Sequence, residues 1–331
     1  MVLRLVALAA ALAAALALLV PGAGLPAASG GAELAYVALE DEDAVAAVML
    51  DTGEVTARIP VPRGPHNVTV AGDGRSVLVT SPPAGAVTLV DAFPPAKVLK
   101  VFRGLRSPHD VELAPDGRYA YVTEERGGTV AVLSLTTRRI VRRVSVGAGP
   151  HDLAVRPDGR RVWVTHGPGS RLITILRTDR PALATVLGHV GSLPAHDIAF
   201  ARNGLFVWVT YWGSAGLVGE IRAYERTGRL RLQQLVGTLV HHVEVDVGGR
   251  LWATDHVAGR VLRLSSSSGR PVFGFGGCPG AHHVAIGPGH GYVAAACHDA
   301  GTLAMYDPET KRVARVPVGP GPHGVAIAFV P

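Results

Sequence analysis

The sequence predicts an all-β fold, a seven-bladed β-propeller of four-stranded antiparallel blades. The 41 glycines and 24 prolines in 331 residues interrupt the chain too often for several long helices. Apolar residues make up 48% of the sequence and charged residues only 18%, a composition typical of short buried strands between turns and not of disordered chains. A pattern of His-x-aliphatic-x-aliphatic returns seven times, at intervals of 43, 42, 45, 45, 41 and 41 residues. These intervals are close to the ~40–45 residues of a four-stranded blade.

Each copy of the repeat contains one histidine in register with the others. These registered histidines are His66, His109, His151, His196, His241, His282 and His323. In the copy that begins at His109, a Pro-Asp-Gly turn over 114–118 precedes a second strand over 119–123. A third strand is expected over 129–135 and a fourth over 140–146, so seven copies predict seven blades.

The two ends of the repeat array are expected to complete one blade together. The last copy supplies only a first strand, over 323–330. The segments 34–38, 44–50 and 54–61 supply the other three strands. Pairing the two ends closes the ring and leaves no blade face free. We therefore expect a single propeller domain over 30–331.

Residues 1–29 are predicted to be a secretory signal peptide. Arg4 precedes an apolar run from Leu5 to Val20, and small residues continue to Ser29. The run is shorter than the ~20 residues that a membrane-spanning helix needs. We therefore expect a soluble, exported monomer in the periplasm, outside the cell or at its surface, with an uncleaved anchor as the alternative.

The net charge of +6 raises the question of a nucleic-acid partner. Almost all of the positive charge is arginine, and arginines such as those at 138–143 flank or alternate with apolar residues in a predicted edge strand. Charge on edge strands prevents unwanted strand pairing. We interpret the basic residues in this way and expect no nucleic-acid partner.

The repeat units share a turn followed by an aliphatic and aromatic strand. One unit reads Pro-Asp-Gly-Arg-Tyr-Ala-Tyr-Val-Thr over 115–123, and Gly-Gly-Thr-Val-Ala-Val follows it at 127–132. Such units resemble the YVTN-type β-propeller repeat of exported bacterial proteins, over nearly all of the chain after residue 33. The resemblance implies the fold but no single activity, because that family includes surface proteins, lactonase-like enzymes and propellers associated with electron transfer. The family's fourth position, usually Asn, is Glu124, His166 or Tyr211 in three of these copies, so no ring of Asn is expected.

The registered histidines are the first candidate site. The first strand of each propeller blade lines the central channel, so we expect all seven imidazoles at one channel mouth. Imidazole is a good ligand for copper, zinc, iron and nickel, and a site needs only three or four ligands. Glu124, Asp255, Asp110, Asp152 and Asp197 could accept hydrogen bonds from the ring nitrogens. The predicted metal ligands are His66, His109, His151, His196, His241, His282 and His323, with copper, zinc or iron as the cofactor.

The histidines are also similar in arrangement to those of nitrous-oxide reductase, whose propeller holds a copper cluster through several histidines. The sequence has no cupredoxin-like segment and no second copper-site motif, so that reaction is not predicted. Crowded imidazoles lower one another's pKa values, which favours the neutral form that binds metal. The strand alternation leaves another arrangement open, because His66 shares the parity of Val68 and could pack between blades.

A second set of candidates lies where the second strand of each copy ends, on the same face. These residues differ between copies, which suits a site for one asymmetric ligand. The ligand-binding candidates are Glu40, Ser81, Glu124, His166, Tyr211, Trp212, Asp255 and Cys297, with His256 and His298 one step further along the chain. Cys278 and Cys297 are the two cysteines, and they either form a disulfide or leave Cys297 as a soft ligand.

The sequence therefore predicts an exported propeller that binds a transition metal or a small ligand. Two alternatives stay open. One is a lactonase- or lyase-like enzyme that pairs His109 or His151 with Glu124 for acid–base catalysis. The other is a surface module that binds another exported protein or a polymer, with histidines that are only structural.

Overall fold

The computed structural model describes residues 31–71, 74–93, 96–167, 170–190, 194–212, 218–246, 248–289 and 291–330. The predicted signal peptide over 1–29 lies outside these residues. No helix of the described residues has both the length and the apolar character needed to span a membrane.

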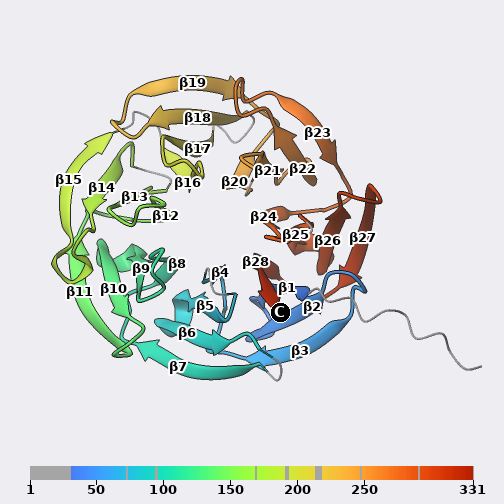
Figure 1. Ribbon diagram of the computed structural model, residues 1–331, viewed down its shortest axis with the longest axis horizontal. Helices are drawn as coiled ribbons and strands as arrows, with labels where there is room; N and C mark the ends of the chain where they lie inside the picture. Colours follow the sequence, from blue (N-terminus) through green and yellow to red (C-terminus); the bar gives the residue numbers. More distant parts are fainter. Residues whose placement is uncertain are drawn as a thin grey trace, which may run out of the picture. The chain divides into compact units, whose positions relative to one another are not determined.

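The described residues form seven sheets, each of four antiparallel strands, arranged around one axis (Figure 1). The first three blades contain β4 (Val68–Val70), β5 (Ser76–Ser81), β6 (Ala86–Asp91), β7 (Lys97–Arg103), β8 (Pro108–Leu113), β9 (Tyr119–Glu124), β10 (Thr129–Ser134), β11 (Arg139–Ser145), β12 (Leu153–Val155), β13 (Arg161–Val164), β14 (Ile173–Arg177) and β15 (Thr185–Val190). The next three contain β16 (Ala195–Phe200), β17 (Phe206–Trp212), β18 (Gly219–Glu225), β19 (Leu230–Leu235), β20 (Val240–Val245), β21 (Leu251–Asp255), β22 (Arg260–Leu264), β23 (Pro271–Phe275), β24 (Ala281–Ile286), β25 (Val293–Cys297), β26 (Thr302–Asp307) and β27 (Arg312–Pro317).

The two ends of the chain close the seventh blade. Its sheet runs in the order β28 (Pro322–Val330), β1 (Ala32–Leu39), β2 (Ala44–Met49) and β3 (Val55–Pro60). The pairing of β1 with β28 extends from Ala32 opposite Val330 to Leu39 opposite Pro322. The predicted number of blades and the predicted closure are both confirmed.

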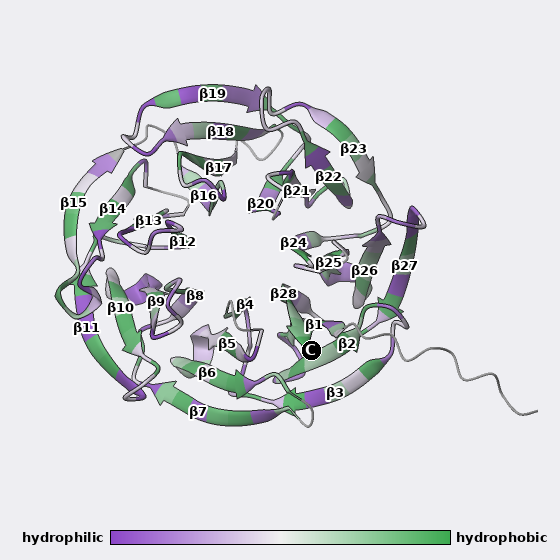
Figure 2. Ribbon diagram, in the orientation of Figure 1, coloured by the Kyte–Doolittle hydropathy of each residue, from purple (hydrophilic) through white to green (hydrophobic). Residues whose placement is uncertain are grey.

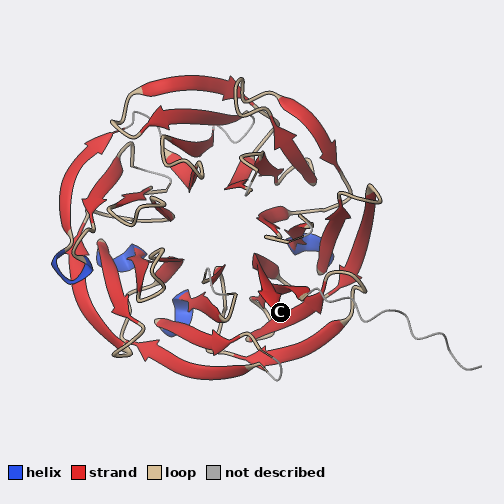
Figure 3. Ribbon diagram, viewed as in Figure 1, coloured by secondary structure: helices blue, strands red, loops and turns tan. Residues whose placement is uncertain are grey.

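Short 3-10 turns, drawn in blue in Figure 3, connect some strands. They are η1 (Pro82–Ala84), η2 (Glu125–Gly127), η3 (Pro181–Leu183) and η5 (His298–Ala300). Three of them, η1, η2 and η5, follow second strands and end at a glycine in the left-handed conformation, as at Gly128 with φ of 61°. A side chain is disfavoured at this φ, which explains the Gly in these turns.

The hydrophobic core lies between neighbouring blades. Strands such as β10 are buried along nearly their whole length, whereas the outermost strand β11 exposes most of its residues. Figure 2 shows the same contrast, with mixed colours along the outer strands. Trp163, Trp208 and Trp252 are buried in these inter-blade clusters, as predicted. Arg139, Arg142 and Arg143 are exposed on the outer edge strand β11, where they can block strand pairing.

A β-bulge in the first strand of the blades orients the site. Pro108 pairs with Glu124 and Val111 with Val122, so three residue steps on β8 oppose two on β9. Four further blades show the same register shift, between β16 and β17, β20 and β21, β24 and β25, and β28 and β1. The extra residue changes the parity of the side chains. Val111 therefore enters the core, while His109 and Asp110 are free to face the axis.

Candidate metal centre

The seven registered histidines form a closed ring around the propeller axis, here called the histidine ring. Each imidazole lies beside those of the two neighbouring blades. The ring-centroid distances, in order around the axis, are 4.4 Å for His66–His109, 3.8 Å for His109–His151, 4.6 Å for His151–His196, 4.3 Å for His196–His241, 3.8 Å for His241–His282, 3.7 Å for His282–His323 and 3.6 Å for His323–His66. The imidazoles therefore face one another at the axis and do not pack between the blades.

A threonine on the second strand holds the backbone at each of several registered histidines. The Thr165 hydroxyl donates to the carbonyl oxygen of His196 in the next blade at 2.6 Å, and it accepts the N–H of Asp152 in its own blade at 3.0 Å. The same contact to the next blade's histidine carbonyl is made by Thr80, Thr123, Thr210 and Thr254. This hydroxyl ties adjacent blades together at the histidine ring.

The residues that follow the registered histidines form a second layer below the ring. These residues are Asn67, Asp110, Asp152, Asp197, His242, His283 and Gly324. Three of these side chains accept a backbone N–H from the first strand of the next blade: Asp110 accepts from Leu153 at 2.9 Å, Asp197 from Val243 at 2.6 Å and His242 from Val284 at 3.3 Å. The layer is acidic on one side of the axis. On the other side, the His242 and His283 rings stack at 4.2 Å.

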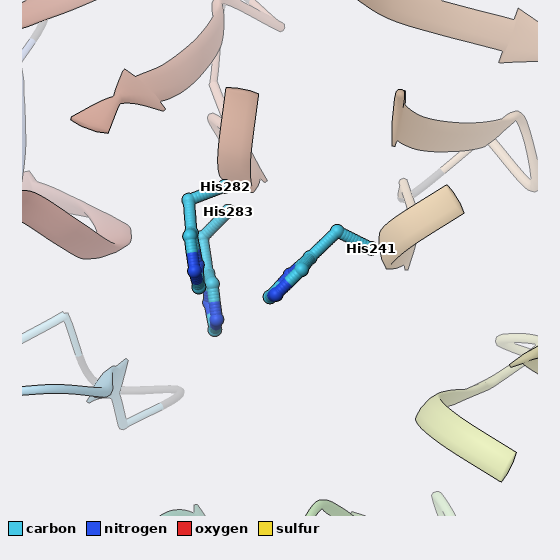
Figure 4. A group of neighbouring side chains, drawn as sticks. All are labelled: His241, His282 and His283. Carbon is cyan, nitrogen blue, oxygen red and sulfur yellow. The ribbon is translucent and has the colours of Figure 1, made fainter. Parts of the chain in front are cut away.

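Two groups of these side chains could hold a metal ion. The first, here called the imidazole trio, is His241, His282 and His283, with one ring nitrogen from each within 4.8 Å of the others. Figure 4 shows the His241 ring, from β20, pointing toward the rings of His282 and His283, both from β24. His241 and His283 are buried. The Nδ1 atoms of His241 and His282 are also buried and have no hydrogen-bond partner among the described residues.

The electrostatics of the imidazole trio favour neutral rings. Burial lowers the pKa of all three histidines well below the usual value, and the positive charge that neighbouring imidazoles would carry lowers them further. The same causes lower the pKa of His66 and His323. A neutral imidazole keeps a lone pair available for a metal ion, so this half of the ring is in the form that binds metal.

The second group is His109, His151 and Asp152. The two Asp152 carboxylate oxygens lie 3.2 Å from His109 Nδ1 and 3.0 Å from His151 Nδ1. Burial raises the pKa of Asp152, but the two histidines outweigh burial and hold it well below the usual value. Burial lowers the pKa of His109, and the adjacent Asp152 carboxylate outweighs burial and gives a net rise. Asp152 is thus a carboxylate, and it favours protonation of the imidazole beside it.

Most of the predicted second set does not face the axis. The side chains of Ser81, Glu124, His166 and Asp255 are bonded to the loop that leads into the first strand of their own blade. Cys297 is joined to that loop by a disulfide with Cys278, which excludes it as a soft ligand. Tyr211 is buried, and its hydroxyl bonds to that of Tyr224 at 2.7 Å. The physical reason is that strand alternation turns this position sideways, toward the incoming loop.

Glu124 illustrates the difference best. Its buried carboxylate accepts hydrogen bonds from Arg106 N–H at 3.0 Å, the Thr129 hydroxyl at 2.6 Å and Arg143 Nε at 2.9 Å. These three donors fix the position of the Glu124 carboxylate. The carboxylate that lies beside His109 and His151 is that of Asp152. The acid–base pair expected with Glu124 is therefore replaced by one with Asp152.

In three blades the residue one step further along the second strand lies beside the ring. Trp212 stacks on His196 at 4.2 Å, and the His256 ring lies 5.4 Å from that of His241. His298 lies 5.9 Å from His282. Glu40 occupies the corresponding position in the blade that closes the ring. Burial raises its pKa, and the charges of His298 and His109 offset only part of this rise. Aligning the copies on Thr210 and Thr254 of the second strands would have put Trp212 and His256 in one register.

His283 is the trio member that the predicted ligand set omits. The doublets His241-His242 and His282-His283 were the available signal, because a bulge can bring both residues of a doublet to one side. His189 lies apart, on the outermost strand β15, where it bonds the hydroxyl of Thr174 at 3.0 Å. That hydroxyl also bonds His166 at 2.7 Å. His290 lies outside the described residues.

Comparisons with solved structures identify the same architecture in other proteins. A protein of unknown function from Desulfotomaculum acetoxidans superposes with a TM-score of 0.76 at 18% identity, over 90% of this chain and 99% of that one. A proposed 6-phosphogluconolactonase from Bacteroides uniformis gives 0.70 at 16% identity, over 90% and 100%. Hydrazine synthase from Kuenenia stuttgartiensis gives 0.68 at 16% identity, over 85% and 91%. At these identities the similarity shows the fold alone.

No curated protein matches the sequence. A family model does match: it covers residues 2–221, which include the predicted signal segment and the strands from β1 to the start of β18. With the closed seven-bladed ring, this match places the chain in the family of YNCE-like beta-propellers.

Proposed function

We propose that the protein is a binding protein for a transition metal ion, held by His241, His282 and His283. The observation that carries the proposal is the convergence of three ring nitrogens within 4.8 Å, two of them belonging to rings whose buried Nδ1 atoms have no hydrogen-bond partner among the described residues. Buried polar atoms are almost always bonded. A metal ion at this point would satisfy lone pairs that the protein leaves open.

The ligand chemistry supports copper, zinc, iron or nickel. The imidazole trio offers nitrogen and no carboxylate, and this donor set suits these ions better than magnesium or calcium. The lowered pKa values of the three histidines keep the rings neutral near pH 7. Three protein ligands leave a coordination position for a small molecule. His256 and His298, beside the trio, would contact such a molecule.

We also propose that the chain is exported. A disulfide between Cys278 and Cys297 supports this, because disulfides persist in oxidising compartments. The resemblance of the repeats to the YVTN-type repeat of exported bacterial proteins supports it too. Fractionation of bacterial cells that express the full chain should recover the protein outside the cytoplasm and shortened at its N-terminus. Full-length protein in the cytoplasm would contradict export without affecting the metal proposal.

Calorimetric titration of untagged, metal-stripped protein with Zn²⁺ tests the metal site. We expect about one strong site per chain, and His282→Ala should weaken it by about 100-fold or more, because the loss of an outer-shell partner alone already costs 10–100-fold. His189→Ala is the control. It removes an imidazole that lies apart from the ring, on the outermost strand β15, and it should change the affinity less than about threefold. Equal Zn²⁺ affinity in wild type and in the triple variant His241→Ala, His282→Ala, His283→Ala would refute the proposal.

A further inference from the structure

We infer that the histidine ring carries a second cation site of a different chemical class, formed by His109, His151 and Asp152. Its donor set is two imidazoles and one carboxylate. The cation it would take is a harder divalent ion, such as Mn²⁺ or Fe²⁺. This site goes beyond the proposed function, and it shares no residue with the imidazole trio.

The geometry around Asp152 is that of atoms that converge on a common point. His109 Nδ1 and one Asp152 carboxylate oxygen lie 3.2 Å apart, yet neither atom has a hydrogen bond of acceptable geometry among the described residues, although both are buried. The ring N–H direction therefore does not meet the oxygen. Ligand atoms at ~2.0–2.2 Å from one metal ion are separated by about 3 Å. The 3.2 Å between His109 Nδ1 and Asp152 Oδ1 matches this spacing, and His151 Nδ1 is hydrogen-bonded to the other Asp152 oxygen at 3.0 Å.

The charge around the site also favours a cation. Asp110 and Asp197 flank Asp152 in the second layer, and in the described part of the chain their partners are backbone N–H groups, Asn67 and histidine rings. Asp152 and Asp197 are buried. Buried carboxylates are stabilised by a countercharge. A divalent ion on Asp152 would supply that charge to all three carboxylates.

The two sites differ in hardness and are separated along the ring. A carboxylate oxygen among the ligands shifts the metal preference of the site toward Mn²⁺ and Fe²⁺. Two imidazoles with one carboxylate are a known ligand set for Fe²⁺. His196 stands between His151 and His241 on one side of the ring. On the other side, His66 and His323 stand between His109 and His282. An ion on one site therefore leaves the ligands of the other in place.

Electron paramagnetic resonance of free Mn²⁺ during titration of untagged, metal-stripped full chain tests the inference. We expect about one Mn²⁺ bound per chain, and Asp152→Asn should weaken binding by about 10-fold or more, because it removes the only anionic ligand of this site. Asp116→Asn is the control: it removes a carboxylate from an exposed turn of the blade that carries His109, and it should keep Mn²⁺ affinity within about threefold. If Asp152→Asn lowers the melting temperature enough to prevent the measurement, His109→Gln tests the same site.

The outcome can be separated from that of the imidazole trio. His282→Ala should leave Mn²⁺ binding unchanged, so Mn²⁺ binding in a chain that fails to bind Zn²⁺ at the trio would still support the second site. Wild type that binds no Mn²⁺, or binding that is equal in wild type and Asp152→Asn, would overturn it. Loss of Mn²⁺ binding in His282→Ala would also overturn it, because the ion would then be held by the trio.

Discussion

The hydroxyl of Thr165 donates a 2.6 Å hydrogen bond to the carbonyl oxygen of His196, in the next blade. The same hydroxyl accepts the N–H of Asp152. One buried side chain therefore fixes two first strands, and with them an imidazole of the ring and the carboxylate of the second layer. Four other blades repeat the contact, which makes it the main local link between neighbouring blades at the ring.

Thr165→Val should lower the free energy of unfolding by about 1–3 kcal/mol. Valine has a similar shape but leaves a buried N–H and a buried carbonyl oxygen without the hydroxyl. Denaturant unfolding measures the change, and Thr165→Ser is the control, because it keeps the hydroxyl and should retain most of the stability. Equal losses in the two variants would mean that the hydrogen bonds are not the cause.

Replacing both Cys278 and Cys297 by alanine should lower the free energy of unfolding by about 3 kcal/mol, because the disulfide closes a loop with a sequence separation of 19. Wild type unfolded under reducing conditions should show a similar loss. Zn²⁺ stoichiometry of the folded variant should stay that of the wild type, since Cys297 is not a ligand in the proposed site. A fall in Zn²⁺ stoichiometry would contradict the assignment of Cys297 to structure alone.

Glu124→Gln should destabilise the blade without altering metal binding. One carboxylate oxygen accepts both from the Thr129 hydroxyl and from Arg143 Nε, and an amide NH₂ in its place would oppose these donors. We expect a loss of about 1–3 kcal/mol in thermal or denaturant unfolding. Glu125→Gln, at the neighbouring half-buried position, should stay within about 0.5 kcal/mol of wild type. Reduced Zn²⁺ affinity in Glu124→Gln at full stability would instead favour a role at the ring.

Zn²⁺ binding to the imidazole trio should persist below the pH at which free imidazole gains a proton. Protons and metal compete for the same lone pairs, and the pKa values of His241, His282 and His283 are lowered by burial and then by neighbouring imidazoles. Affinity should therefore be nearly constant from pH 7.5 to about 6.5, the usual histidine pKa, and fall only under more acidic conditions. Calorimetric titrations at several pH values measure this. A loss that begins above pH 7 would show that the rings titrate like exposed histidines.

The sequence predicted the architecture because blade number depends on local, repeated information. The interval of about 43 residues between registered histidines reports one four-stranded unit, and the strands left over at the two ends can be satisfied only by pairing with each other. The buried tryptophans Trp163, Trp208 and Trp252 followed from the same register. The signal segment and the role of the histidines as ligands stay predictions.

The candidate site was predicted only in outline. The sequence indicated that imidazoles gather at one end of the axis, and its second set combined two registers: Trp212 lies beside the ring, whereas Glu124 and Asp255 are bonded to the incoming loops. Strand alternation alone could not resolve this, because a single bulge or turn residue reverses which side chains face the axis.

By itself, the sequence determined the repeated unit, the number of blades and the presence of one histidine per blade, since each is set by spacing along the chain. Only the tertiary structure decided which neighbours those histidines have. Asp152 meets His109 across 43 positions in the sequence, and His241 meets His282 across 41, because the first strands of adjacent blades lie side by side at the axis.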